Sequence, residues 1–327
     1  MSAGPAPRPL WSGAGPAERT LDVLGIGQCS LDHVVFVDAA PAPGEIADAP
    51  GALELPGGQV ATAVLACARL GLRCAYAGAV GDDAAAEVVL APLKQAGVGL
   101  SGVRRIPGAL TRRAVIAVER ASGERHVHPR RDPRLVLPPE AVDAAQVRSA
   151  RALHLDAEHP LASARAAALA REAGVAVLLD LDTPGAGLEP LLAHADFPIV
   201  SRRFAEWISG EGSARAGLRE LLRRGARLAV ATLGPDGALA LAAGEREPLA
   251  SPGFRVDARD TTGAGDVFHA AFAFGLLEGW GAARVLRTAN AAAALSCRSV
   301  GAQGGLPERS ALEALLAASA PRAGAGG

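Results

Sequence analysis

The residues with the clearest chemical potential lie in Arg259–Phe268, where Arg-Asp-Thr-Thr-Gly-Ala-Gly-Asp-Val-Phe enters an alanine-rich helical pattern. Gly263 and Gly265 permit backbone angles at which successive N–H groups converge, and the start of a helix adds its positive dipole end. The segment therefore predicts an anion cradle made of backbone groups. Asp266 is either an ordinary carboxylate of the first helical turn or a general base that takes a proton from a hydroxyl attacking phosphorus.

A second glycine-rich segment, Leu55–Ala63, also leads into a helical pattern, which ends at Leu70-Gly71. Gly57 and Gly58 would let a ligand approach the backbone closely, and Thr62 lies near the helix start. A Gly-Gly pair before a helix is more often only a tight turn, so this segment alone does not identify a binding site.

The elements that must position these residues follow the rhythm of βαβ units, in which short apolar runs alternate with helical segments. The expected strands are Asp22–Gly25, Ala75–Ala79, Ala152–Leu155, Ala176–Asp180, Phe197–Val200 and Leu228–Thr232. The expected helices are Thr62–Leu70, Ala84–Ala96, Ala162–Ala173, Ala214–Arg224, Asp266–Leu277 and Ala282–Ser299. This order predicts an α/β fold around a mainly parallel sheet.

Two segments break the rhythm. Leu31–Asp38 alternates apolar and polar residues, and Thr111–Arg120 with Glu124–His128 is typical of a hairpin around a Ser-Gly turn. These strands are too isolated from crossover helices to join the parallel sheet. They predict a small β-layer that covers one edge of the main domain as a lid.

Composition excludes several classes of protein. The chain has 327 residues, 33 Lys+Arg against 34 Asp+Glu and only 3% aromatic residues, so we expect a core of Ala, Leu and Val. A net charge of −1 disfavours a nucleic-acid or anionic-membrane partner, because both need a concentrated basic face. Lys94 is the only lysine, and its place in a helical run before Gly97 is typical of a solvated last-turn residue. A P-loop or protein-kinase lysine is thereby excluded elsewhere.

The cysteines and the termini predict the cellular compartment of the protein. Cys29, Cys67, Cys74 and Cys297 lie in apolar runs without CxxC spacing, so we expect free thiols in a reducing compartment, and thus a cytoplasmic protein. We expect a disordered tail over residues 1–20, which lacks the pattern of a signal peptide, and a frayed tail over residues 318–327. No apolar stretch is long enough to predict a transmembrane helix.

The two glycine-rich segments, in this order and at this separation, resemble the two signature regions of the PfkB-type carbohydrate kinases, the ribokinase-like family. The resemblance implies a three-layer α/β/α sandwich with a central, mainly parallel sheet and a small β-sheet lid. It implies a kinase domain over residues 21–317, with the lid at about 31–56 and 109–130. It also implies an ATP-dependent kinase that uses Mg²⁺ and phosphorylates a primary hydroxyl of a small sugar, ribose-like or fructose-like.

The resemblance assigns roles to particular positions. Asp266 resembles the family's catalytic base, and Gly263, Ala264 and Gly265 its anion hole. Asp32 resembles a carboxylate that holds two sugar hydroxyls, beside Gly57, Gly58 and Thr62. The positions that resemble the family's nucleotide site are Ser201, Thr232, Gly234, Gly237 and Asn290. Those where the family often binds a monovalent cation such as K⁺, mostly through carbonyls, are Asp260, Thr262, Ser296, Ser299, Gly301 and Gly305.

Three departures bear on the substrate. Thr62 stands where the family commonly has an asparagine, and Gln59 where ribokinases have a lysine, so a strict ribose assignment does not follow. The family's Asn-x-x-Glu aligns with Ser201–Phe204, which lacks the glutamate, so Mg²⁺ would be held through water and ATP phosphates. In the predicted lid, Arg131 within Arg130–Arg134 is either solvated or grips a polar or anionic substrate group through its bidentate fork.

Other functions remain open at this level. The same fold could phosphorylate a nucleoside or a vitamin alcohol, although Phe36 is the only aromatic residue near the predicted lid. A non-catalytic sugar sensor is a second alternative, against which the intact Asp260–Asp266 argues. A dinucleotide-dependent oxidoreductase, suggested by Gly25-Ile26-Gly27, lacks the third glycine of that fingerprint. Lids of this family can pair, so a homodimer is compatible with the resemblance.

Overall fold

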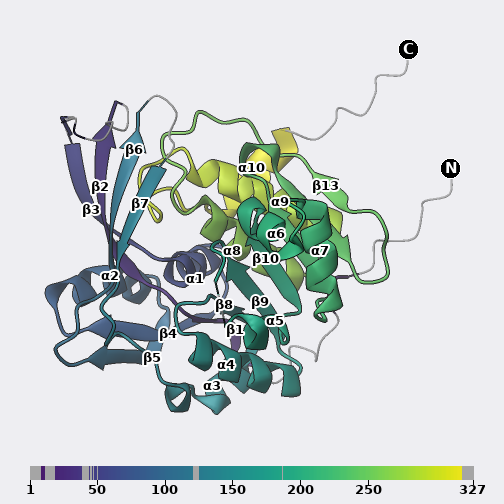
Figure 1. Cartoon of the computed structure of the whole chain (residues 1–327), viewed down its shortest axis with the longest axis horizontal. Coiled ribbons are helices and arrows are strands. Elements are labelled where there is room, and N and C mark those ends of the chain that lie inside the picture. Colours follow the sequence, from purple (N-terminus) through teal and green to yellow (C-terminus); the bar gives the residue numbers. More distant parts are fainter. Residues whose placement is uncertain are drawn as a thin grey trace.

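The computed structural model describes residues 9–11, 19–38, 44, 46, 48–49, 51–120, 125–185 and 187–318 (Figure 1). Within them, two separate β-sheets are present, one large and one small. The large sheet carries helices on both of its faces, and the small one stands apart from it above α2 (Ala84–Gln95) in the view of Figure 1.

The strands of the large sheet lie in the order β13-β12-β11-β10-β9-β8-β1-β4-β5. Neighbours from β11 through to β5 pair in parallel, whereas β12 and β13 are antiparallel additions at one edge. The bounds are β1 (Leu21–Ile26), β4 (Cys74–Gly81), β5 (Gly99–Ile106), β8 (Ala150–Leu155), β9 (Ala176–Leu181), β10 (Phe197–Ser201), β11 (Leu228–Thr232), β12 (Ala238–Ala242) and β13 (Leu249–Ser251). The central strands are buried on both faces, which explains their continuous apolar runs.

Two apolar clusters, one on each face of the large sheet, define the layers. The first joins the sheet to α1 (Gln59–Arg69), α2, α8 (Ala264–Leu277), α9 (Ala282–Ser296) and α10 (Arg309–Ala318). The second joins it to α3 (Ala144–Ser149), α4 (Pro160–Glu172), α5 (Glu189–Leu192), α6 (Arg202–Ser209) and α7 (Ala214–Arg223). Ala, Leu and Val dominate both clusters, as the composition predicts. The three-layer α/β/α fold is therefore confirmed.

The predicted elements are present, with differences at their ends. The prediction for the last long helix was wrong at its C-terminus, because α9 ends at Ser296 and not at Ser299. There the Cys297 carbonyl oxygen accepts from the N–H groups of Arg259 (2.8 Å) and Asp260 (3.3 Å), which draws the chain out of the helix. Strands β5, β12 and β13 and helices α3, α5, α6 and α10 were not predicted, because most are short or lack a clear apolar period.

The small sheet has the order β3-β2-β6-β7, with β2 (Ser30–Val37), β3 (Gly51–Gly57), β6 (Arg113–Glu119) and β7 (Arg125–Arg130). The alternation along β2 and the β6–β7 hairpin are confirmed, whereas the predicted Ser-Gly turn lies outside the described residues. Val34, Ala114, Ile116 and Val118 form the small core of this sheet, with Phe36 and Leu55 packed against it. We call this sheet the lid.

The strand order predicts where a ligand site lies. The strand order reverses at β1. From β1 the sheet extends through β4 to β5 on one side, and through β8 and β9 toward β13 on the other. Ligands in open α/β sheets bind beyond the carboxyl ends of the strands at such a switch point. The lid begins there as well, because β2 starts four residues after β1 ends.

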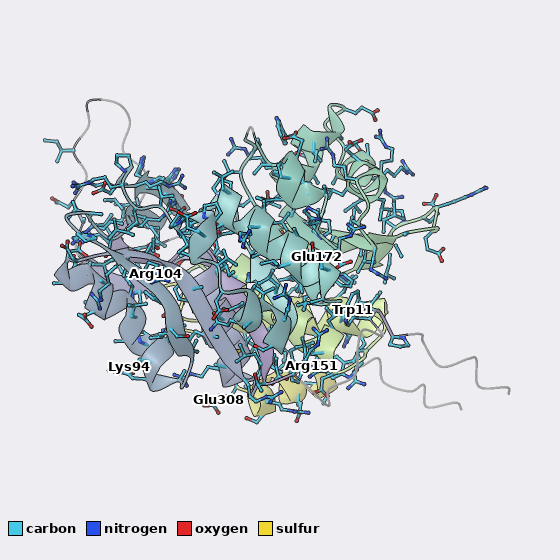
Figure 2. The ribbon with its side chains drawn as sticks, turned by 90° about the horizontal axis from the view of Figure 1, so that it is seen from below. Trp11, Lys94, Arg104, Arg151, Glu172 and Glu308 are labelled. Carbon is cyan, nitrogen blue, oxygen red and sulfur yellow. The ribbon has the colours of Figure 1, made fainter. Side chains whose placement is uncertain are left out.

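Two side chains labelled in Figure 2, Lys94 and Trp11, lie toward opposite ends of the molecule in that view. Lys94 is exposed in the last turn of α2 at the outer edge of the molecule, as predicted. Toward the other end, Trp11 packs edge-on against Phe197 at 6.0 Å and lies under the Arg227 guanidinium. No helix among the described residues is both long and apolar enough to cross a membrane.

Candidate active site

The glycine-rich loop ends in a left-handed residue that starts α8. Gly263 has φ 81°, and a Cβ there would lie 2.6 Å from the carbonyl oxygen of Ala302, so only glycine fits. Gly265 and Asp266 lie in the first helical turn, where backbone N–H groups have no preceding carbonyl to bind. Apart from its chain neighbours and the backbone of its own helix turn, no described atom lies within 4 Å of a Cβ built on Gly265. The helix start is thus an open cradle that fits a phosphoryl group.

Asp260 fixes the base of this cradle. Its carboxylate is fully buried, and its two oxygens accept from the N–H groups of Thr262 at 2.8 Å and Gly301 at 2.7 Å. The side chain therefore joins the glycine-rich loop to the loop that follows α9, and its hydrogen bonds are a structural link between them.

The six residues predicted to bind a monovalent cation come together around that link. The N–H of Ser299 donates to the Ser296 carbonyl oxygen at 3.3 Å, and a Cβ on Gly305 would overlap that same oxygen. The Thr262 hydroxyl is buried and has no hydrogen-bond partner among the described residues. The glycine-rich loop and the segment after α9 thus contact each other here, and the Ser296 hydroxyl itself donates back to the Ala293 carbonyl oxygen.

Asp266 occupies an electrostatic environment suited to a base. Burial, followed by the charge of Asp180, raises the pKa of the Asp266 carboxyl well above its usual range. Arg125 of the lid opposes this effect, and Asp32 contributes to it. A carboxylate with a raised pKa is a stronger base, so this environment favours proton abstraction.

The Asp32 side chain of β2 lies against Gly57 of β3, whose cross-strand partner is Ser30. Ser30 Oγ donates to Asp32 Oδ1 at 2.7 Å, and a Cβ on Gly57 would overlap Asp32 Oδ2. Gly58 has φ 99°, and a Cβ there would lie 2.5 Å from Cys29 Cα. Gly57 therefore makes room for the Asp32 carboxylate, and Gly58 lets the chain pass close to Cys29. The Asp32 carboxylate is mostly buried, and this burial raises its pKa.

Thr62 does not lie on an open surface that a substrate could contact. Its side chain is fully buried in α1, and its hydroxyl accepts from Gln303 Nε2 at 3.4 Å. The neighbouring Gln59, at the first position of α1, hydrogen-bonds Asp180. Thr62 thus connects α1 to the loop after α9.

Arg131 belongs to an ion triad with Arg112 and Glu158. Glu158 Oε2 lies 2.7 Å from both Arg112 Nη1 and Arg131 Nη2, and the Glu158 side chain is only 3% exposed. Arg131 also lines a cavity of about 280 Å³ with seven other residues, among them Arg113, Arg130 and Arg134. Arg131 of the predicted arginine-rich loop is thus held by a buried carboxylate, and this loop lines the cavity.

Next to this triad, Asp156 is fully buried beyond the end of β8. Its carboxylate accepts from the N–H groups of Gln28 at 2.8 Å and Glu158 at 2.9 Å. Burial and then the charge of Glu158 raise the pKa of Asp156 to about 7. Arg112 lowers the pKa of Asp32, so the triad lies within electrostatic reach of the predicted sugar-binding carboxylate.

The residues predicted to face the nucleotide lie where neighbouring strands end. Ser201 ends β10 and caps α6 by accepting from the Phe204 N–H at 3.1 Å, and Thr232 ends β11. Gly234 and Gly237 have φ 63° and 94° in the loop that follows. Asn290 differs, because its buried amide donates to Ser251 and Pro252 and holds the end of β13.

Sequence reasoning missed several polar residues of this region. Arg125 Nη1 donates to the Thr261 carbonyl oxygen at 2.6 Å, which connects the lid to the glycine-rich loop. Asp156 and Asp180 lie on apolar strands or just beyond them, and His154 and His269 lie inside apolar runs. A polar residue at a core-facing position was the signal available for these.

The sequence and the fold of the chain are similar to those of known proteins. A family model described as "pfkB family carbohydrate kinase" matches residues 20–309. A ribokinase of Bacillus subtilis is 31% identical over 307 residues, covering 90% of this chain and 99% of that protein. An ATP-dependent ribose-1-phosphate kinase of Halopiger xanaduensis is 31% identical, covering 90% and 97%. The structure of Arabidopsis thaliana ribokinase complexed with ribose and ATP superposes with a TM-score of 0.78 at 25% identity, covering 90% and 98%.

Proposed function

Because the chain belongs to the pfkB family of carbohydrate kinases and is an ATP-dependent kinase, we propose that it phosphorylates a primary hydroxyl of a small sugar with Asp266 as base. The observation that carries this proposal is the position of Asp266, in the first turn of α8 directly beside the open backbone cradle.

Asp266 takes the proton of the acceptor hydroxyl as that oxygen attacks the γ-phosphorus, and the bond to the leaving ADP oxygen breaks. Asp32 holds the acceptor from the lid side. Its mostly buried carboxylate is a strong acceptor for sugar hydroxyls, and its Oδ1 is already oriented by Ser30. The negative charge of Asp32 reaches Asp266, so the two carboxylates flank one reaction volume.

The cradle stabilises the charge on the transferred phosphoryl group through the N–H groups of the first turn and the helix dipole. Mg²⁺, when bound with ATP, would neutralise charge on the phosphates, and the missing glutamate leaves it held mainly through water. We propose that the nucleotide lies against the strand ends at Ser201 and Thr232 and the exposed loop at Gly234, and that the buried Gly237 shapes this loop from behind. Asn290 would act there only through the end of β13.

Asp266→Asn tests the role of the base. We expect turnover to fall by about 10³-fold, because general bases contribute factors of that order, while ATP affinity measured by calorimetry changes little. Asp257→Asn, which alters an exposed aspartate on the preceding loop, is the matched control and should leave turnover unchanged. Near-normal turnover of Asp266→Asn would refute the assignment.

For the substrate, the ion triad favours an acceptor that carries an anionic group. Two arginines share the one carboxylate of Glu158, so the triad itself carries one positive charge, between the acceptor carboxylate Asp32 and the buried Asp156. The Nε of Arg112 is buried without a hydrogen-bond partner among the described residues, so it has a donor left to give. The Halopiger relative, whose name specifies ribose 1-phosphate, shows that a phosphorylated acceptor occurs among similar proteins.

An acceptor screen decides this point. Ribose and fructose are compared with ribose 1-phosphate and fructose 1-phosphate, and with adenosine as the nucleoside alternative, by ADP release. We expect the sugar phosphates to give the higher kcat/KM and Arg112→Gln to raise their KM by about 10- to 100-fold, as for loss of a charge-assisted hydrogen bond. Equal use of neutral and anionic sugars would remove the anionic assignment and leave the kinase. ATP consumption with any acceptor would exclude a sugar sensor.

We also propose cytoplasmic location and a homodimer. All four cysteines are free, and three of them are buried, as suits a reducing compartment. Leu53 and Val127 are 44% and 47% exposed on the two outer strands of the lid, where a second lid could cover them. Light scattering at micromolar concentration tests the dimer, and a monomer mass would exclude it.

A further inference from the structure

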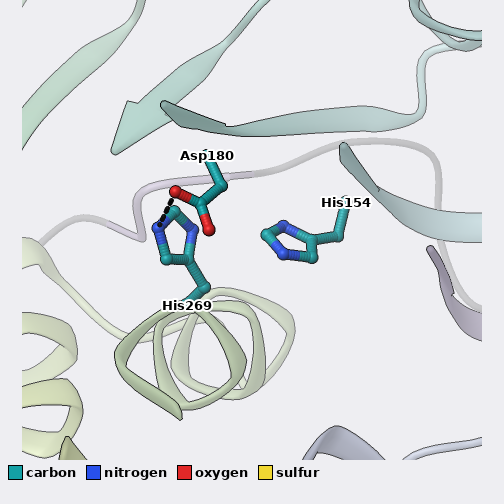
Figure 3. A group of neighbouring side chains, drawn as sticks. All are labelled: His154, Asp180 and His269. Atoms are coloured by element: carbon teal, nitrogen blue, oxygen red, sulfur yellow. Dashed lines mark ion pairs between the residues drawn. The ribbon is translucent and has the colours of Figure 1, made fainter. Parts of the chain in front are cut away.

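Three buried polar side chains meet between the large sheet and α8 (Figure 3). His154 comes from β8, Asp180 from β9 and His269 from α8, and each is less than 7% exposed. Their ligand atoms all lie within 4.8 Å of one another, and His269 Nε2 is 3.3 Å from Asp180 Oδ1. Among the described residues, no other group of His, Cys, Asp and Glu side chains meets in this way.

The hydrogen bonding of this cluster is incomplete. Neither ring nitrogen of His154 has a partner among the described residues, and neither has Nδ1 of His269. A neutral imidazole carries one donor and one acceptor, and leaving both buried and unpaired is costly. The cluster is therefore built from polar groups whose bonding capacity the protein itself does not use.

We propose that His154, Asp180 and His269 bind a first-row divalent transition ion of the Zn²⁺ class. Two imidazoles and one carboxylate are the three-ligand set of four-coordinate zinc sites in which a water molecule takes the fourth position. They suit Mg²⁺ poorly because it prefers oxygen ligands. A neutral imidazole offers a ring nitrogen lone pair to a metal, and both His154 and His269 have ring nitrogens without a partner among the described residues. Gln59 hydrogen-bonds Asp180 from α1 and would orient that ligand.

The distances require only a modest rearrangement. Ligands on a tetrahedral zinc ion lie about 3.4 Å apart, and the Nε2–Oδ1 distance of 3.3 Å already fits that value. His154 faces the other two residues, with its ring centre 5.0 Å from that of His269 (Figure 3). Its ring must approach by roughly 1–1.5 Å, and no hydrogen bond among the described residues has to break for that movement.

Such an ion would cross-link the middle of the sheet to α8 three residues beyond Asp266. It lies in the apolar layer between sheet and helix and not in the open cradle, so it is separate from the Mg²⁺ that accompanies ATP. The site adds a structural element to the fold, and its existence does not depend on the proposed substrate.

Metal content provides the first test. The full chain is produced in medium with added Zn²⁺, dialysed against metal-free buffer and analysed by mass spectrometry of the elements. We expect about one zinc per chain for the parent and for His194→Leu, and none for His154→Leu. His194 is the matched control, because its Nδ1 is also buried without a partner but the residue belongs to no ligand group among the described residues.

Cobalt supplies a second readout, which can be measured on the parent protein alone. Protein produced with Co²⁺ in place of Zn²⁺ should show the intense visible absorption of four-coordinate Co²⁺, unchanged by excess Mg²⁺ and absent from His154→Leu. Parent protein without metal, or with only the weak absorption of six-coordinate Co²⁺, would overturn the proposal. Retention of the metal by folded His154→Leu would overturn it equally.

Discussion

Arg125 in the lid and Thr261 in the glycine-rich loop are joined by two hydrogen bonds. Arg125 Nη1 donates to the Thr261 carbonyl oxygen at 2.6 Å and lies 3.0 Å from its Oγ1. The charge of Arg125 also lowers the pKa of both Asp32 and Asp266. One side chain thus holds the lid against the loop and adds positive charge where acceptor and phosphoryl group would meet.

Replacing Arg125 with Gln should lower kcat about tenfold, because the lid loses its link to the loop and the site loses a cation. Arg125→Lys keeps the charge and should retain more activity than Arg125→Gln. Steady-state kinetics measure both variants, with Arg104→Gln on the exposed edge strand β5 as control. An unchanged kcat in Arg125→Gln would show that the link has no part in turnover.

Gly57→Ala should damage acceptor binding selectively. The added methyl overlaps Asp32 Oδ2 and must displace that carboxylate, so the KM for the sugar rises while the KM for ATP stays constant. Gly51→Ala, at the other end of β3, is the matched control, because its Cβ would meet only Phe36 at an ordinary 3.6 Å. Equal sugar KM values for Gly57→Ala and the parent would contradict the role given to Asp32.

Asp156 should make the protein less stable as pH rises. Its pKa is about 7 in the folded chain and about 3.9 when unfolded, so between these values the folded state keeps a proton that the unfolded state releases. The free energy of unfolding therefore falls between about pH 4 and pH 7, by at most about 4 kcal/mol. Asp156→Asn does not titrate and should lack this contribution.

Urea unfolding of the parent and Asp156→Asn at several pH values measures the difference. Comparing the two proteins cancels other titrating groups, such as His159, whose pKa is lowered to about 4 and whose effect on stability has the opposite sign. Curves that stay parallel from pH 4 to pH 7 would mean that Asp156 is ionised throughout.

Potassium should activate the enzyme. Hydrogen bonds hold the segments around Asp260 and Ser296 together at the base of the cradle, where we expect a large monovalent cation to stiffen the loop that carries Gly263. After dialysis against tetramethylammonium salts, added K⁺ should raise kcat several-fold. The midpoint of thermal unfolding should change little. A rate independent of K⁺ would refute this cation site.

Local sequence determined the parts of the protein that depend on neighbours along the chain. The left-handed turn at Gly263, the helix that follows it and the carboxylate of Asp266 all lie within a few residues, so their geometry is encoded locally. The alternation of β2 likewise predicted a separate lid, because a strand with one buried face has a period of two residues.

Contacts between distant segments were decided only by the tertiary structure. The resemblance located Asp260 in a cation site, yet the structure shows both carboxylate oxygens holding N–H groups from two loops. Asn290 was assigned to the nucleotide, and its amide is bound to the end of β13. Side-chain partners of this kind depend on how the elements pack, which no single segment specifies.

The grouping of His154, Asp180 and His269 is the clearest example of a contact that only the tertiary structure decided. Each residue is a polar interruption in an apolar run, a signal that the sequence analysis did not use, and the structure shows all three buried. Their meeting depends on the pairing of β8 with β9 and on α8 lying across both strands. The sequence by itself thus determined the fold class and the cradle with Asp266, and tertiary packing decided which buried polar groups share a site, because that depends on distances across the sheet.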